Sequence, residues 1–168
     1  MPKIQTNTKT FEDVLDAVKN KGLKVTAPNK GDSFEIGKAK CEVMTDSILN
    51  KDNLNLSSIV IRLEFENNSF LFMGDAETAN EKTRTWMKTD VLKVGHHGSN
   101  TSSSEDFLKQ INPTYAVIMA GKNNSYGLPK QKILDRLAKI GAKVYRTDEE
   151  GTIMMISNGN NIEVKENT

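Results

Sequence analysis

The feature that most constrains this chain is an apolar run, Val91 to Val94, that leads directly into Gly95-His96-His97-Gly98. A short apolar run bounded by glycine is typical of a buried strand, and glycine frees the backbone for a turn. The segment therefore predicts a strand that opens into a loop at the only two histidines of the protein. This pair is the strongest candidate for a chemical site in the sequence.

A second junction of the same kind lies upstream. The segment Ser69 to Met73 reads as a strand and ends in Gly74-Asp75, which leaves a carboxylate at a strand terminus before the histidines. One carboxylate and one or two imidazoles on neighbouring strand ends are able to share a metal ion. Taken alone, a Gly-Asp pair at a strand end is more often a turn than a metal ligand. Adjacent histidines alone fit a solvated loop or a core pair as well as they fit a metal site.

Composition excludes several classes of protein. The 168 residues fit one domain, and with 23 basic and 22 acidic side chains no overall field recruits nucleic acid or an anionic membrane. Cys41 is the only cysteine, which excludes a disulfide framework and favours a buried structural role. No run is long enough to span a bilayer, and Met1 to Ile4 lacks a signal peptide's apolar segment, so we expect a soluble chain.

The first half predicts a helix, short strands and a long loop. Apolar residues spaced by three and four follow Thr10, and Gly22 ends this helix, which needs a partner surface. Ser58 to Phe65 alternates apolar and polar residues, and Asn67-Asn68 turns it into the next strand. The other expected elements are strands at 23–26 and 34–45, a loop at 46–58 on the rim of a site, and the returning hairpin strand at 70–72.

The second half alternates strands with helices. The expected helices are 77–87, with Trp86 and Met87 as inward contacts, then 104–111, and a segment that begins at Pro129 and ends at Gly141. The expected strands are 91–94, 115–120 and 144–146, followed by a hairpin of 152–156 with 162–164. With no internal repeat and no linker, this order predicts one α/β layered domain with a mixed sheet.

Five segments in this order resemble the metallo-β-lactamase-fold domain of ComEC-type competence proteins. The resemblance extends from about Leu54 to Ile153, and the block Gly-His-His-Gly-Ser is its most specific part. It implies that residues 1–168 form a single, partial domain, the C-terminal half of an αββα sandwich. The segments are Asn55–Leu63, Phe70–Glu77, Asp90–Ser99, Gly121–Pro129 and Val144–Ile153.

The resemblance also implies a metal site. Members of the family hold one or two divalent metals, commonly zinc or manganese. Asp75 matches the carboxylate that bridges the two metals, and His96-His97 matches the histidine ligand motif. Consecutive side chains on a strand point to opposite faces, so unless the chain has already turned, only one of the two histidines can face the metal. We expect His97, which is nearer the loop, to be the ligand, with His96 as a supporting partner or a phosphate contact.

The implied reaction is hydrolysis by a metal-held hydroxide, with DNA phosphodiesters as the expected substrate of the ComEC domain. Metal ions generate the nucleophile from water and neutralise the charge that grows on the phosphoryl oxygens. We assign catalysis to Asp75 and His96. Candidate hydrogen-bond donors to the substrate are Ser99, Thr101, Asn123 and Tyr126.

Two departures from the family weaken the expected activity. The family's main metal motif, His-Xaa-His-Xaa-Asp-His, is absent, since no histidine precedes His96, and a catalytic metal normally takes three protein ligands. We therefore expect poor metal affinity. Leu128 stands where the family often has histidine, and leucine can neither ligate a metal nor transfer a proton.

The absent half of the sandwich also has a structural consequence. An apolar sheet face that is normally covered would be exposed in this chain. The expected partners are therefore a second copy of the chain or the missing N-terminal half, with nucleic acid or another phosphodiester as substrate.

Two functions of different class remain open. The first is a metal-dependent hydrolase domain, or the catalytic half of one, that acts on phosphodiesters. The second is a non-catalytic, truncated module whose sheet serves only folding or association. An unrelated α/β binding domain would require the match of five segments to be accidental.

Overall fold

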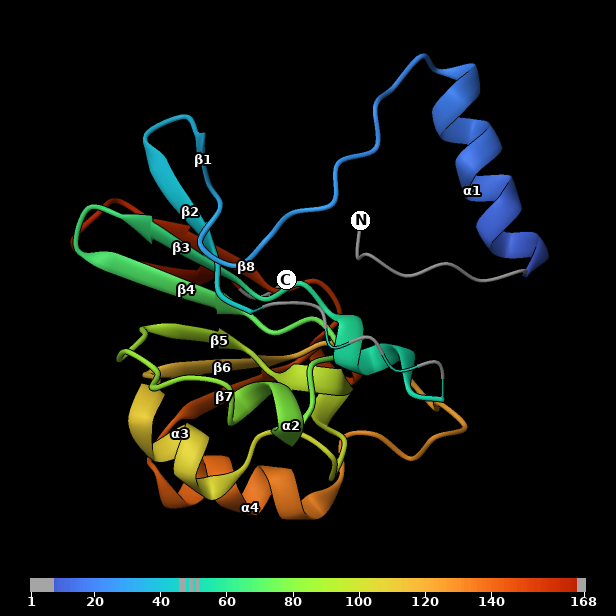
Figure 1. Ribbon diagram of the computed structural model, residues 1–168. Coiled ribbons are helices and arrows are strands. Elements are labelled where there is room, and N and C mark those ends of the chain that lie inside the picture. Colours follow the sequence, from blue (N-terminus) through green and yellow to red (C-terminus); the bar gives the residue numbers. More distant parts are fainter. Residues whose placement is uncertain (1–7, 46–47, 49, 51, 166–168) are drawn as a thin grey trace.

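The computed structural model describes residues 8–45, 48, 50 and 52–165. They form a seven-stranded sheet with helices on one face and a separate two-stranded ribbon, which confirms the predicted mixed α/β fold (Figure 1). The helices are α1 (Lys9–Asn20), α2 (Thr78–Glu81), α3 (Glu105–Ile111), α4 (Gln131–Lys139) and α5 (Thr147–Glu150), with 3-10 turns η1 (Leu54–Ser57) and η2 (Gly95–Gly98). The strands are β1 (Ser33–Ile36), β2 (Ala39–Val43), β3 (Ile61–Phe65), β4 (Asn68–Phe72), β5 (Val91–Lys93), β6 (Tyr115–Ile118), β7 (Lys143–Arg146), β8 (Met154–Ser157) and β9 (Ile162–Lys165).

The strands lie in the sheet in sequence order, from β1 to β7. Neighbours from β1 to β4 are antiparallel, whereas neighbours from β4 to β7 are parallel. Parallel neighbours need a crossover connection, and α2, α3 and α4 make the three crossovers on one face of the sheet (Figure 1). The carboxyl ends of β4, β5 and β6 therefore meet at one edge.

The face of the sheet under these helices holds the main core. Phe107 of α3 packs edge-on against Trp86, with ring centroids 5.1 Å apart. The core also contains these buried apolar side chains from strands and helices: Leu71, Leu92, Ala116, Ile118, Leu108, Ile111, Ile133 and Leu137.

The other face of the sheet is apolar and only partly covered. Phe34 of β1 and Phe72 of β4 are 45% and 42% exposed. The β8–β9 ribbon is tied to the β3–β4 turn, where Asn67 N donates to Gly159 O at 2.9 Å. A hollow of about 270 Å³ remains on this face, lined by Phe70, Leu71, Phe72, Val91, Lys93, Val117, Met119, Ile153 and Met155. The sheet thus has one face covered by helices and one face that is only partly covered.

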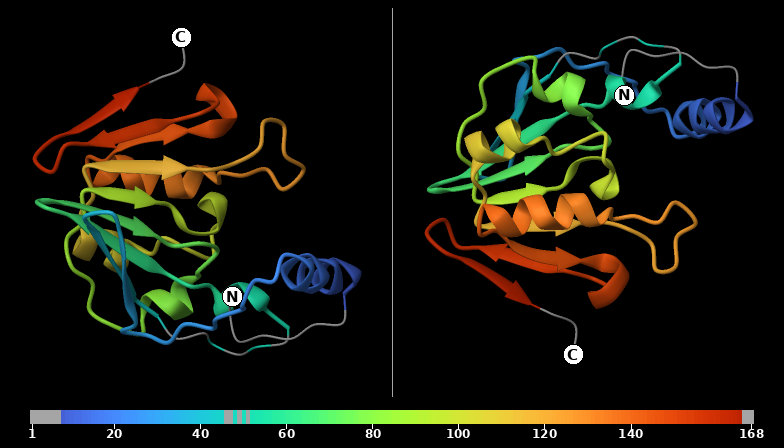
Figure 2. Two further views of the ribbon diagram at one scale, coloured as in Figure 1. Left: turned by 90° about the horizontal axis from the view of Figure 1, so that it is seen from above. Right: turned by 90° about the horizontal axis from the view of Figure 1, so that it is seen from below.

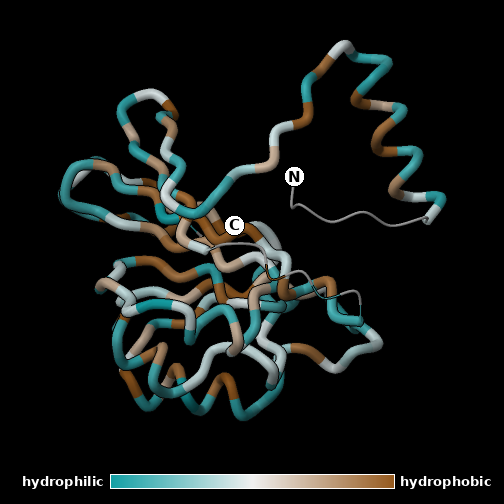
Figure 3. The backbone as a smooth tube through the Cα atoms, in the orientation of Figure 1, coloured by the Kyte–Doolittle hydropathy of each residue, from teal (hydrophilic) through white to brown (hydrophobic). Residues whose placement is uncertain are grey.

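Helix α1 lies away from the sheet, at the end of an extended segment (Figure 1). Thr8 caps it by accepting the backbone N–H of Phe11 at 3.3 Å, so the helix start is close to the predicted one. Its apolar positions alternate with polar ones along the helix (Figure 3). No residue of α1 is buried, and Val14 and Leu15 are 44% and 38% exposed. The partner surface that the sequence led us to expect is therefore not supplied by the described part of the chain.

Two predicted strands differ from the structure. Residues 23–26 are not a strand, and the expected strand at 34–45 is the β1–β2 hairpin, folded back at Gly37-Lys38. Gly37 has a φ of +60°, a left-handed conformation that glycine adopts without steric cost. The alternation of apolar and polar residues changes phase at Gly37-Lys38, between Ile36 and Ala39, and this change was the available signal of the turn. The predicted loop at 46–58 contains η1, and residues 46–47, 49 and 51 of it lie outside the described residues.

The predicted helix at 77–87 is wrong beyond its first turn. α2 ends at Glu81 because side chains take the carbonyl groups that would continue it: Thr83 Oγ1 donates to Asn80 O at 2.7 Å, and Trp86 Nε1 donates to Glu81 O at 2.6 Å. Trp86 is buried as predicted. Met87 is 48% exposed, so its assignment as an inward contact is wrong.

The remaining predicted elements are present, with bounds that differ from the predicted ones by up to three residues. The β3–β4 hairpin turns at Glu66-Asn67, one residue earlier than expected, with Glu66 at a φ of +51°. Ser104 caps α3, α4 ends before Gly141, and β8 pairs with β9. α5 was not predicted. Cys41 is buried, and burial raises the pKa of its thiol, as befits a structural rather than a reactive cysteine.

Within the described ranges, no helix has the length and apolar character needed to cross a membrane.

Glu81 gives a test of how the fold secures the loop after the histidines. Its buried carboxylate accepts the backbone N–H groups of Ser103 and Ser104, at 2.5 and 3.0 Å, at the start of α3. Because Glu81→Ala leaves these groups without their charged acceptor, we expect it to lower the free energy of unfolding by about 2–4 kcal/mol. Urea denaturation measures this change. Glu35→Ala, on exposed β1, is the control, and equal losses in both variants would contradict the assignment.

Candidate functional site

Three loops converge where β4, β5 and β6 end (Figure 2). Gly74-Asp75 follows β4, the turn η2 follows β5, and Met119 follows β6. Polar groups gathered at the carboxyl ends of parallel strands are a common place for a binding site in α/β folds. Both strand termini singled out in the sequence lie at this edge.

The structure brings Asp75 and His97 together. His97 Nδ1 lies 2.5 Å from Met119 O, and its Nε2 lies 3.3 Å from Asp75 Oδ1. Because a carbonyl oxygen only accepts, Nδ1 carries the proton and Nε2 is the nitrogen presented to the carboxylate. The two side chains are 44% and 40% exposed, so both are accessible from outside.

His96 does not join this pair. Its Nδ1 lies 3.1 Å from Thr101 Oγ1 and 3.3 Å from Glu77 Oε1, and its Nε2 lies 3.3 Å from Asn55 Nδ2. An amide nitrogen donates, so Asn55 occupies the lone pair of Nε2 and Nδ1 donates to the oxygens. The centroids of the two imidazole rings are 6.3 Å apart.

The backbone of η2 explains why the imidazoles diverge. His96 and His97 both have left-handed conformations, with φ values of +46° and +54°. The chain has therefore already turned at the histidines, which is the case in which strand alternation does not apply, and the divergence comes from this turn.

The flanking glycines of η2 are required by close packing. A Cβ on Gly95 would lie 2.9 Å from Ala76 O, and a Cβ on Gly98 would lie 2.6 Å from Pro129 Cβ. Gly98 also has a φ of +81°. Side chains at these two positions would displace the turn that presents the histidines.

The carbonyl of Gly74 holds the Asp75 strand end against β5. It accepts the backbone N–H of His96 at 3.0 Å and Lys93 Nζ at 2.9 Å, while Asp75 N donates to Ser58 Oγ at 3.2 Å. Burial lowers the pKa of Lys93, and the nearby negative charge of Asp75 acts in the opposite direction. Lys93 therefore places a positive charge beside the candidate ligand.

Glu77 organises the second polar cluster, and the sequence analysis did not single it out. Its carboxylate accepts Asn53 Nδ2 at 2.9 Å and Thr101 Oγ1 at 3.0 Å, in addition to its contact with His96. Its position two residues after Asp75 was the only available signal. Asn55 was also missed as an individual residue, because its contact with His96 spans forty-one positions.

The four predicted substrate contacts fall into two groups. Ser99 and Thr101 lie beside His96 and bond to each other, with their hydroxyl oxygens 3.1 Å apart. Asn123 and Tyr126 lie on the loop after β6 and are exposed, Tyr126 by 78%. Asn124, which the sequence analysis passed over, bonds across this loop to Gly121 and Leu128.

The donor set limits what the site can hold. Asp75 and His97 offer one oxygen and one nitrogen, which suits zinc or manganese, yet a catalytic zinc normally takes three protein ligands. Among the described residues, no group of three His, Cys, Asp or Glu side chains is arranged to hold a metal ion. The pair is chemically suitable for a metal but incomplete in this part of the chain.

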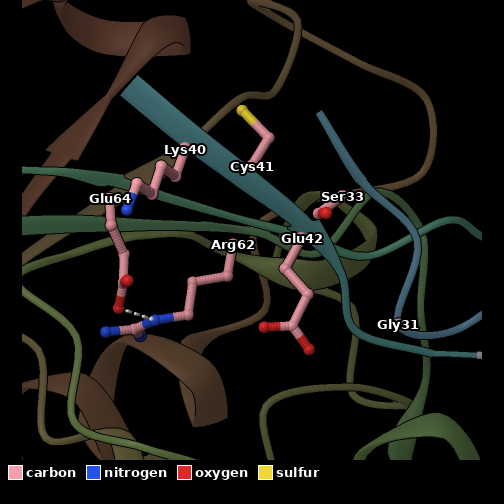
Figure 4. Close-up of a pocket in the computed structure, with 7 residues that line it drawn as sticks. All are labelled: Gly31, Ser33, Lys40, Cys41, Glu42, Arg62 and Glu64. Atoms are coloured by element: carbon pink, nitrogen blue, oxygen red, sulfur yellow. Dashed lines mark hydrogen bonds and ion pairs between the residues drawn. The ribbon is translucent and has the colours of Figure 1, made fainter. Parts of the chain in front are cut away.

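A separate hollow over β1 to β3 shows a different character (Figure 4). Its charged side chains include Arg62 and Glu64, which form an ion pair with Nε and Oε1 2.9 Å apart. Arg62 also donates to Lys88 O at 3.1 Å. The guanidinium is thus committed to structural contacts, and the hollow contains none of the predicted site residues.

Comparison with known proteins identifies the family. Residues 12–122 match the family model described as the metallo-beta-lactamase superfamily. The chain belongs to this superfamily. Superfamily members typically bind divalent metals, and the region matched by the model includes Asp75, His96 and His97.

Two curated relatives of this metallo-beta-lactamase chain are much longer proteins. ComE operon protein 3 of Bacillus subtilis is 36% identical over 157 residues, which cover 91% of this chain and 20% of that protein. Recombination protein 2 of Haemophilus influenzae is 42% identical over 101 residues, which cover 59% of this chain and 13% of that protein. The chain thus spans about a fifth of the relatives' length or less.

A solved structure is also similar at low identity. It is a putative zinc-dependent hydrolase of the metallo-beta-lactamase superfamily from Thermotoga maritima, with 14% identity and a TM-score of 0.44. The match covers 73% of this chain and 72% of that one.

The position of Lys93 predicts a pH dependence of stability. Because burial lowers its pKa in the folded state, the unfolded chain binds this proton more tightly, and stability should rise with pH toward the ordinary lysine pKa of 10.5. Below the folded-state pKa the penalty is fully present. We expect Lys93→Met to abolish this rise, measured by urea denaturation between about pH 8 and pH 10. Lys38→Met, at the exposed β1–β2 turn, should keep the wild-type slope, and an unchanged slope in Lys93→Met would contradict the argument.

Proposed function

We propose that residues 1–168 are a single, partial metallo-beta-lactamase domain that contributes Asp75 and His97 to the divalent-metal site of a phosphodiester hydrolase. In this proposal the remaining ligands come from a partner region, which completes the site. The greater length of the relatives supports such a region. The chain by itself is then a weak or inactive enzyme.

One observation carries the proposal. Nδ1 of His97 donates to Met119 O, so Nε2 faces Asp75 Oδ1 at 3.3 Å and carries a lone pair whenever the imidazole is neutral. Two acceptors that face each other repel unless a proton or a metal cation lies between them. A histidine that binds metal usually donates its other ring N–H to a carbonyl or carboxylate, as His97 does.

The proposed role of each site residue follows from its contacts. A metal held by Asp75 and His97 would supply an activated water and would stabilise charge on the phosphoryl group. His96 is held by Glu77 and Asn55, so it acts beside the metal, in contact with substrate or solvent, unless Asn55 moves and frees its Nε2 for ligation. Ser99 and Thr101 keep this imidazole in place through their hydroxyl groups.

The substrate class rests on resemblance and on the names of relatives. Two of the relatives are named Competence protein ComA, from Neisseria gonorrhoeae, and Recombination protein 2, from Haemophilus influenzae. These names support a phosphodiester of a nucleic acid as substrate.

A second candidate function is association without catalysis. The open apolar face with Phe34 and Phe72, and an amphipathic α1 that buries no residue, favour a module that joins a second copy or the missing half of the sandwich. Leu128 in place of the family's histidine is consistent with lost catalysis.

Metal titration tests the hydrolase proposal without requiring activity. We expect the purified chain to bind Zn²⁺ weakly and with one principal site in isothermal titration calorimetry. Asp75→Ala and His97→Ala each remove one of the two ligands, so each should weaken binding by more than about tenfold. His96→Ala is the matched control, because it removes an imidazole but leaves the pair intact, and it should have the smaller effect.

The ranking of these variants decides the outcome. Equal binding by the wild type and by Asp75→Ala, or a larger loss in His96→Ala than in His97→Ala, would reject the assignment of ligands.

Association is tested by light scattering after size exclusion. We expect the wild-type chain to self-associate at high concentration and Phe72→Asp to be more monomeric, because a charge on the open face opposes its burial. Glu35→Asp, an exposed charge-conserving change, is the control. A wild type that stays monomeric at all concentrations would contradict self-association through this face.

A further inference from the structure

The loop between β6 and α4, together with the first residues of α4, concentrates positive charge. Residues 121–132 contain Lys122, Lys130 and Lys132 and no acidic residue, in a chain whose formal net charge is only +1. Local lysines attract phosphate even when the whole chain is nearly neutral. We refer to residues 121–132 as the basic loop.

The basic loop borders the candidate site directly. A hollow of about 220 Å³ lies between them, and one part of its wall is His97 itself. The other lining residues are Ala120, Gly121, Asn124, Tyr126 and Leu128. The hollow is therefore apolar in character and adjoins the imidazole that faces Asp75.

Hydrogen bonds hold the basic loop in shape. Asn124 Nδ2 donates to Gly121 O at 2.9 Å and to Leu128 O at 2.7 Å, and Leu128 N donates back to Asn124 Oδ1 at 3.0 Å. These bonds commit the polar groups of Asn124 to the loop. The hollow is thus formed before a ligand arrives, which reduces the entropy cost of binding.

Two further contacts fix the loop relative to the histidine turn. Lys130 N donates to Gly98 O at 3.0 Å, and Lys130 Nζ donates to Tyr126 O at 2.8 Å. Tyr126 nevertheless exposes 78% of its surface, and in the described part of the chain no ring contact involves it. A rigidly carried, solvent-facing aromatic ring is well suited to stacking on a flat ligand.

We propose that this hollow binds one unstacked nucleobase of a single-stranded nucleic acid, with the ring of Tyr126 stacked on the base and the lysines of the basic loop near the backbone. The inference rests on the proposed function, because it places a phosphodiester beside Asp75 and His97. An aromatic platform combined with basic side chains is the usual way in which proteins hold single strands without reading sequence.

The dimensions favour a single strand. Pockets for drug-sized ligands have volumes of about 300–1,000 Å³, so a hollow of about 220 Å³ suits one ring system. A base inside a duplex is stacked on both faces and must leave the helix to enter such a space. In this proposal Leu128 helps to bind the base, because its aliphatic side chain forms part of the apolar wall of the hollow. A histidine at this position would make that wall polar.

Binding of labelled oligonucleotides to the full chain tests the proposal. The probes are a fluorescein-labelled 12-residue oligothymidylate and an abasic strand of equal length and charge, measured by fluorescence anisotropy in EDTA. We expect the wild type to bind the thymidylate about 5- to 100-fold more tightly than the abasic strand. Tyr126→Ala should remove this preference, whereas Tyr126→Phe, which keeps the ring, should retain it. Met87→Ala, which truncates an exposed apolar side chain outside both the candidate site and the open sheet face, is the control.

The lysines are tested by salt dependence with the same probes. Lys122→Gln should weaken binding of both strands equally and reduce the slope of log affinity against log salt by about 0.7, the value for one phosphate contact on a single strand. Lys38→Gln, at the β1–β2 turn, should leave the slope unchanged.

Equal affinity for the two strands, or a base preference that survives Tyr126→Ala, would overturn the proposal. The measurement requires neither a metal nor hydrolysis. If the chain prefers the thymidylate strand but binds no metal, the result supports the base-binding hollow and rejects the hydrolase proposal. If it binds metal without preferring the thymidylate strand, the result supports the hydrolase proposal and rejects the base-binding hollow.

Discussion

The candidate site depends on one left-handed turn that joins the end of β5 to the ends of both neighbouring strands. His96 donates its backbone N–H to Gly74 O after β4, and His97 donates through Nδ1 to Met119 O after β6. Non-glycine residues adopt this conformation at a cost of about 1–2 kcal/mol each. The bonds to both neighbours offset that cost and set the direction in which each imidazole leaves the backbone.

Much of the fold could be predicted because its signals are local. Ser104 lies at the start of α3 and Gly141 follows α4, so each helix carries its own boundary in the sequence. The predicted helix at 77–87 failed for the opposite reason. There Trp86 bonds back to the carbonyl of Glu81, and this contact depends on how the indole is buried against Phe107, a residue far along the chain.

The positions of the candidate site residues were predictable for the same reason. Asp75 and His97 each follow the carboxyl end of a strand, and adjacent parallel strands bring such ends to the same edge of the sheet. His97 was expected to be the ligand because it is nearer the loop, and the left-handed turn that directs it toward the carboxylate has no signal beyond the flanking glycines. Glu77 and Asn55 were not found, because their contacts with His96 join separate segments and leave no periodic pattern in the sequence.

The close contact between Gly98 and Pro129 makes the histidine turn and the loop after β6 a single mechanical unit. An added Cβ at Gly98 would meet Pro129 at 2.6 Å, and the next residue, Lys130, donates its N–H to the Gly98 carbonyl. A shift of Pro129 would therefore act directly on the backbone that carries His97. Because Gly98 also has a φ of +81°, a smaller residue at position 129 would not by itself admit a side chain at position 98.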